Sequence, residues 1–145
     1  MTPKITIDPK SKRVLIDIGQ ASKKHKKALR LALNEIGSDV VNKISNYIFN
    51  PPKTGRWYTY RGRRYQASAP GQSPANRSGR LAKSGGYRVR NYYELKIYET
   101  APYAGYLEFG TRKMAPRPHV IRAINANRRN LVRSIEDHIK KELSR

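Results

Sequence analysis

The side chains best suited to chemistry lie near the middle of this 145-residue chain, where arginines alternate with aromatic residues. A guanidinium pairs through a planar fork with phosphate or carboxylate groups. Aromatic rings add faces on which bases can stack. We therefore expect this stretch to contact another subunit or an anionic partner. The residues expected at such an interface are Trp57, Tyr58, Tyr60, Arg61, Arg63, Arg64 and Tyr65.

The distribution of charge supports an anionic partner. Residues 51–90 contain ten basic and no acidic side chains, and the formal net charge of the chain is +21. Such an excess repels itself unless a nucleic acid or an acidic protein surface lies nearby. A solvated loop that charge keeps soluble is the alternative interpretation. If DNA is the partner, the arginines expected to face it are Arg61, Arg63, Arg64, Arg77 and Arg80.

Catalytic chemistry has little support in the sequence. The chain has no cysteine, which excludes disulfides, thiolate zinc ligands and thiol nucleophiles. His25, His119 and His138 lack the spacing of metal ligands. Glu94 and Glu99, five apart on a predicted strand, should face opposite ways, so no carboxylate pair is indicated. We expect no enzyme activity, no metal and no cofactor.

Hydropathy argues against a membrane partner. No run approaches the roughly 18 apolar residues of a membrane helix, and the first ten residues contain no apolar signal core. We therefore expect the protein to be made and used in a cytoplasm.

The first half of the chain predicts a hairpin followed by a long helix. Apolar residues alternate on both sides of the turn formers at 8–11, which is typical of two paired strands. Apolar residues then recur every three or four positions between Ser22, a suitable N-cap, and Phe49. Pro51 and Pro52 should end this helix. The lysines in its first turns have the wrong sign for a helix N-terminus, which predicts either a start nearer Ala28 or a neutralising partner.

The second half alternates short strands with two more helices. We expect a hairpin over 57–65 that turns at Gly62, a loop over 66–80, strands at 87–90 and 93–98, a short helix over 103–109 capped by Gly110, and a long final helix after Pro118. This order predicts an α+β fold with an antiparallel sheet flanked by two long helices. We expect one domain, residues 1–145, with a long loop or hairpin arm at 53–80.

Two segments carry motifs. The first is ASAPGQSPA at 67–75, followed by SGRLAKS at 78–84; the second is YAGYLEFGT at 103–111, followed by APRP at 115–118. Together they resemble head–tail joining or tail-completion proteins of tailed bacteriophages, over roughly residues 58–124. The motif residues for which the resemblance implies a structural role are Tyr103, Glu108, Gly110, Thr111, Arg117 and Pro118.

The resemblance implies a structural virion protein of the phage neck, assembled in the host cytoplasm. Its partners would be further copies of itself in a ring, expected to be hexameric, together with the tail tube and the head connector. Non-specific contact with packaged DNA is also expected. A small basic protein that binds nucleic acid non-specifically is the alternative, and a nuclease would need acidic metal ligands that the basic centre lacks.

Two positions within the motifs lead to local expectations. Glu108 should pair with Arg112 or Arg117, or accept backbone N–H groups at the turn, unless it is simply solvated. His119 stands where the family pattern has Phe, so we expect the last helix to dock with more water around it.

Overall fold

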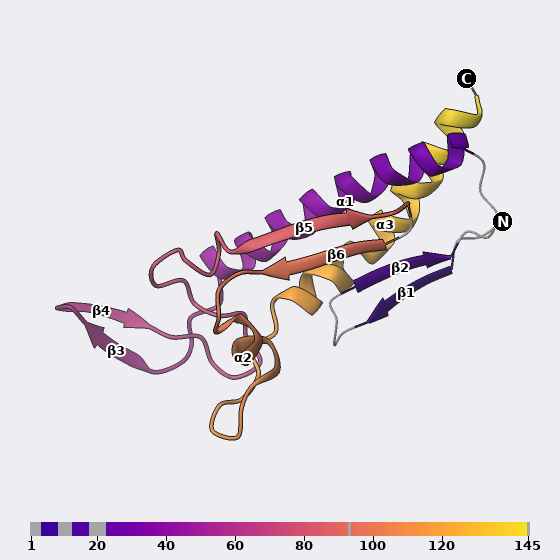
Figure 1. Ribbon diagram of the computed structural model, residues 1–145. Helices are drawn as coiled ribbons and strands as arrows, with labels where there is room; N and C mark the ends of the chain where they lie inside the picture. Colours follow the sequence, from indigo (N-terminus) through magenta and orange to yellow (C-terminus); the bar gives the residue numbers. More distant parts are fainter. Residues whose placement is uncertain (1–3, 9–12, 18–22, 93, 145) are drawn as a thin grey trace. The chain divides into compact units, whose positions relative to one another are not determined.

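The computed structural model describes residues 4–8, 13–17, 23–92 and 94–144. Its elements confirm the expected α+β class: a four-stranded antiparallel sheet in the order β1-β2-β6-β5, a separate β3–β4 hairpin and two long helices (Figure 1). In chain order they are β1 (Lys4–Asp8), β2 (Arg13–Asp17), α1 (Lys23–Phe49), β3 (Trp57–Tyr60), β4 (Arg63–Gln66), β5 (Gly85–Arg90), β6 (Glu94–Glu99), α2 (Ala104–Phe109) and α3 (Val120–Leu143).

The chain divides into two compact units. The sheet unit comprises residues 1–41, 86–98 and 124–145, and the loop unit comprises residues 42–85 and 99–123. The sheet unit contains the four-stranded sheet with most of α1 and α3. The loop unit contains the β3–β4 hairpin, α2 and the long loop that follows β4.

The N-terminal hairpin of the sheet unit forms as predicted. β1 pairs with β2 in an antiparallel register that places Ile5 opposite Ile16 and Ile7 opposite Val14. The apolar alternation produces this register because one face of a strand takes every second residue. The expected turn at 9–11 and the expected N-cap Ser22 lie outside the described residues.

Helix α1 places one apolar stripe in the core of the sheet unit. Leu29, Leu33, Ile36 and Val40 are buried at the spacing of three or four that the sequence predicts. Gly37 lies so close to the ring of Tyr87 on β5 that a Cβ atom would clash with it. The missing side chain therefore lets α1 approach the sheet closely.

Helix α1 starts at Lys23, which confirms the start expected after Ser22 and rules out the alternative start nearer Ala28. No acidic residue occupies its first turn. Unfavourable charge at a helix end costs only about 0.3–1 kcal/mol, and lysine is a good helix former. One cation of this group also has a local partner, since the Lys26 ammonium lies 5.6 Å from the centroid of the Tyr92 ring.

The loop unit confirms the remaining elements. α1 ends at Phe49, before the two prolines, and α2 and α3 start within one or two residues of the expected positions. The core of this unit consists of small and branched apolar side chains: Ile44, Ile48, Leu81, Ala82, Ala101, Ala104, Val120 and Ala123. Residues 67–80 of the expected loop contain no strand or helix, as their composition predicts, whereas Gln66 is the last residue of β4.

Candidate partner and nucleic-acid interface

The β3–β4 hairpin is built around a two-residue turn. Arg61 and Gly62 both have positive φ values, 49° and 73°, which is the conformation of the tight turns that match the twist of paired strands. The register pairs Tyr58 with Tyr65 and Tyr60 with Arg63. Because side chains alternate between faces, these four share one face of the hairpin. Trp57, Thr59, Arg64 and Gln66 share the other.

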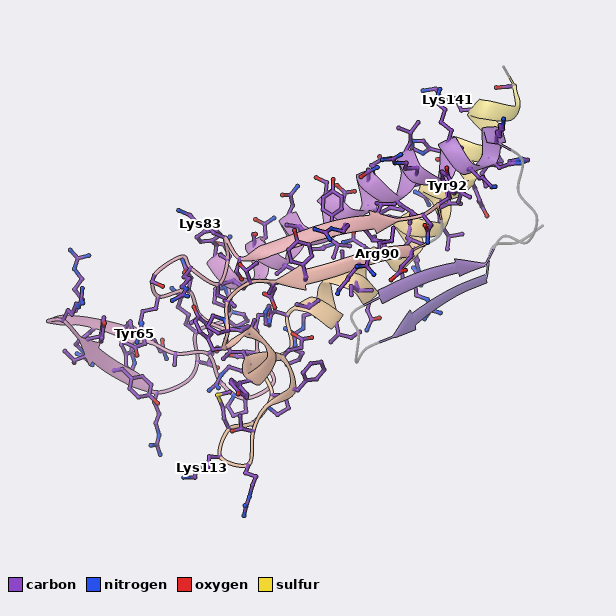
Figure 2. All side chains as sticks on the ribbon, viewed as in Figure 1. Tyr65, Lys83, Arg90, Tyr92, Lys113 and Lys141 are labelled. Atoms are coloured by element: carbon purple, nitrogen blue, oxygen red, sulfur yellow. The ribbon has the colours of Figure 1, made fainter. Side chains whose placement is uncertain are left out.

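Most of the predicted interface side chains on the hairpin are exposed. Figure 2 shows Tyr65 on β4 among the side chains of the two strands. The ring of Tyr65 stacks on Tyr58 with centroids 5.6 Å apart. The Arg64 guanidinium lies 5.2 Å from the centroid of Trp57. Two guanidiniums lie over the Tyr60 ring, that of Arg77 at 4.4 Å and that of Arg61 at 5.5 Å.

Four of these arginines line one groove. Its volume is about 510 Å³, and none of its lining residues is acidic; they are Tyr60, Arg61, Arg63, Arg64, Tyr65, Asn76 and Arg77. A second groove of about 420 Å³ is also lined by Tyr65, Asn76 and Arg77, and adds Arg80 and Arg117. The five arginines expected to face DNA thus lie along two grooves that share three lining residues.

The two motif segments hydrogen-bond to each other within the loop unit. The Arg117 guanidinium donates to the carbonyl oxygen of Ser68 at 3.3 and 3.4 Å. The Gly71 N–H donates to the carbonyl oxygen of Pro116 at 2.9 Å. The Ser73 hydroxyl lies 3.5 Å from the carbonyl oxygen of Pro118. Residues 45 to 49 positions apart in sequence therefore form one joint at the entry to α3.

Gly110 has a conformational reason to be glycine. Its φ is 76°, and its N–H donates to the carbonyl oxygen of Tyr106 at the end of α2. A Cβ atom at this position would lie 2.7 Å from the carbonyl oxygen of Met114. The Thr111 N–H donates to that same oxygen at 2.8 Å. Only glycine allows the chain to turn this tightly behind α2.

Helix α2 also has an exposed aromatic stripe that sequence reasoning missed. Tyr103, at its N-cap, and Tyr106 and Phe109 within it all expose their rings, whereas Ala104 and Glu108 on the same helix are buried. The spacing of three between these aromatics was visible in the sequence. Which face of so short a helix meets solvent depended on the tertiary packing.

Glu108 accepts hydrogen bonds from the first turn of α3. Its carboxylate receives the N–H groups of His119, Val120 and Ile121 at 2.9, 3.0 and 2.9 Å. These amides have no partner inside the helix, and a negative charge is favourable at this end. Burial alone would raise the pKa of Glu108, but the hydrogen bonds from the His119 side chain and from these three N–H groups lower it to about 2.

His119 is held between two carboxylates. Its Nε2 atom lies 2.9 Å from Oε1 of Glu99, the last residue of β6, and its Nδ1 atom lies 3.0 Å from Oε2 of Glu108. Burial alone would lower the pKa of His119. The hydrogen bonds and negative charges of Glu108 and Glu99 outweigh this effect and raise the pKa to about 9. The buried cluster Glu99–Glu108–His119 is therefore ionic at neutral pH and joins the end of β6, α2 and the start of α3.

This cluster decides between the alternatives for Glu108 and corrects the expectation for His119. The carboxylate of Glu108 accepts backbone N–H groups, as one of the alternatives expected, and these groups belong to the start of α3. The guanidinium of Arg117, another expected partner, donates to the carbonyl oxygen of Ser68 instead. His119 is fully buried, so the expected wetter docking of α3 is wrong. A polar side chain can be buried here because the fold supplies two carboxylates. No spacing in the sequence connects Glu99 with Glu108.

Nδ1 of His138 lies 2.8 Å from the carbonyl oxygen of Ser134 within α3, which fits the structural role expected of a helix-face histidine. Across the described residues, no group of three or more potential ligands is arranged to hold a metal ion. None of the helices in this part of the chain is long and apolar enough to span a membrane.

Comparison of the chain with protein-family models, with curated proteins and with solved structures found no match in any of the three.

Proposed function

We propose that this protein is a structural component of the neck of a tailed bacteriophage, in which an oligomeric ring, expected to contain six copies, completes the tail and joins it to the head connector. The resemblance of its two motif segments supports this proposal. The hydrogen bonds between these segments add to that support. The residues that carry the resemblance contact one another and together determine where α3 begins.

The observation that carries the proposal is the aromatic surface of the loop unit. Trp57 is 57% exposed, Tyr106 63% and Phe109 54%, and Tyr58, Tyr60 and Tyr103 are exposed as well. Large exposed apolar patches usually mark protein interfaces, and Tyr, Trp, Phe and Arg are the types enriched there. A stable assembly that covers these rings accounts for them better than a solitary monomer.

The experiment is to replace residues 56–66 by two glycines and to measure the mass of the nuclease-treated protein by light scattering at low and high salt. The Gly55 N–H already donates to the carbonyl oxygen of Ala67 at 2.9 Å, so the ends of the removed segment lie together. We expect a ring for the wild type and a folded monomer for the variant.

Circular dichroism provides the folding control, since the removed residues contribute no helix. A wild-type protein that remains monomeric at high concentration and at both salts contradicts the proposal, as does a variant that assembles like the wild type.

A further inference from the structure

We propose that the groove on the β3–β4 hairpin binds the phosphate backbone of duplex DNA without reading its sequence. The ligand would contact Arg61, Arg63, Arg64 and Arg77, which line the groove. This site goes beyond the proposed place in a virion and does not depend on it.

The first argument is the convergence of like charges. Four exposed guanidiniums line one groove, and two of them lie over the same ring, within 5.5 Å of its centroid. Like charges gathered along one groove repel one another. No acidic residue occurs among the lining residues, nor anywhere between residues 51 and 90. An external polyanion would relieve this repulsion and release the small counterions that otherwise screen it.

The second argument concerns which part of a nucleic acid fits. The aromatic rings of the hairpin are already engaged: Trp57 by Arg64, Tyr60 by Arg61 and Arg77, and Tyr58 by Tyr65. Bases would have to displace these partners in order to stack. A guanidinium near a ring still has its N–H donors at its edge. The rings therefore restrict the arginines to positions from which they can contact phosphates, rather than serving as platforms for bases.

The third argument is size. Each strand of the hairpin has four residues, or about 13 Å at the usual rise of 3.3 Å per residue. This length is enough to span the major groove of B-form DNA, which is about 12 Å wide, and to reach the phosphates at both of its edges. A duplex has one charge per about 1.7 Å of axis, so about 14 Å of duplex matches the eight cations that residues 51–85 contribute within the loop unit. Gly62, at the tip of the hairpin, has no neighbour within 4 Å of an added Cβ atom and leaves the turn free to approach the duplex.

The test measures binding of nuclease-treated protein to fluorescein-labelled duplexes of two unrelated sequences by anisotropy, at salt concentrations from roughly 50 to 200 mM. Each phosphate contact contributes about −0.9 to the slope of log K against log salt. Replacing Arg61, Arg63 and Arg64 by Gln should therefore reduce the slope by about 2.7. The affinity change between these two salt concentrations should then be about 40-fold smaller than in the wild type. Arg77→Gln alone should reduce the slope by about 0.9.

The matched control removes three charges elsewhere. Arg128, Arg129 and Arg133 are exposed on α3 in the sheet unit, and their replacement by Gln gives the same net charge as the hairpin triple. We expect this control to keep the wild-type slope, and both duplex sequences to bind equally well. Circular dichroism on each variant confirms that these exposed substitutions leave the fold intact.

Three outcomes would overturn the proposal. Equal loss of slope in both triples would mean that only net charge matters. Tighter binding of single-stranded than of duplex DNA would point to base stacking. If polyglutamate competes as effectively as duplex DNA for each negative charge, the groove binds an acidic protein surface instead. Light scattering on the same variants separates this site from the proposed ring, because loss of DNA binding with unchanged assembly leaves the ring proposal standing.

Discussion

Raising the pH from 6.5 to 9 is expected to destabilise the protein through His119. The folded-state pKa of this residue is about 9, against an ordinary value of 6.5, because Glu108 and Glu99 hold the proton on the buried ring. The folded state therefore binds the proton more tightly than the unfolded state does. The resulting stabilisation is complete below pH 6.5 and is lost as the pH rises through 9.

The size of the effect follows from the difference between these two pKa values. Each pKa unit corresponds to 1.36 kcal/mol, so the folded state should lose about 3 kcal/mol over this range. That is a large part of the 5–15 kcal/mol typical of a folded domain.

Urea denaturation followed by far-UV circular dichroism, repeated at intervals from pH 6 to pH 9.5, measures this loss. We expect the free energy of unfolding of the wild type to fall steadily above pH 6.5. His119→Gln, which cannot take up the proton, should be less stable at pH 6.5 and should show a much flatter profile. His138→Gln serves as the control, because that histidine is partly exposed and lies 3.7 Å from an exposed Glu35 carboxylate, where an ion pair contributes little.

A flat wild-type profile would refute this reasoning, and so would a decline of equal size in His119→Gln. A direct measurement covers the case in which His119→Gln does not fold. The imidazole signals of the wild type, titrated by NMR, should include one that changes near pH 9. If no imidazole signal changes near pH 9, the pKa of His119 is not raised and the proposed cause is wrong.

Three further predictions concern the loop unit. Gly110→Ala should lower the free energy of unfolding in urea by about 2 kcal/mol, because φ is positive and the Cβ atom meets a carbonyl oxygen. Gly62→Ala, with open space at its Cβ, should cost only about 1 kcal/mol. A larger loss of stability in Gly62→Ala than in Gly110→Ala would contradict this explanation of the turn behind α2. Glu108→Gln should lower the free energy of unfolding by about 3 kcal/mol above pH 4.5. The difference from the wild type should shrink on acidification towards pH 2, because the pKa of Glu108 is lowered in the folded state. A difference that does not depend on pH would contradict this prediction. The double variant Tyr106→Ser, Phe109→Ser should change the free energy of unfolding by less than about 0.5 kcal/mol, because both sites are exposed. It should nevertheless abolish assembly as measured by light scattering. A variant that still forms the ring would show that these two side chains are not part of the interface.

Most secondary structure in this chain could be predicted because its signals are local. Alternation in β1 and β2, the apolar stripe of α1, the two prolines after Phe49 and the glycine behind α2 each depend on residues a few positions apart. The alternative start of α1 near Ala28 arose from a weak electrostatic rule, which the helix propensity of lysine outweighs. The arginines of the candidate groove were identifiable from composition, but their arrangement over the rings was not.

The buried cluster marks the limit of prediction from sequence. Glu99, Glu108 and His119 come from the end of a strand, a short helix and the residue before another helix, and no periodicity connects them. The sequence by itself determined the α+β class, most element boundaries and the basic, aromatic character of residues 53–80, because backbone preferences and charge are properties of neighbouring residues. Only the tertiary structure decided that His119 would be dry and charged, because the energy of a buried ion depends on which distant carboxylates the fold places against it.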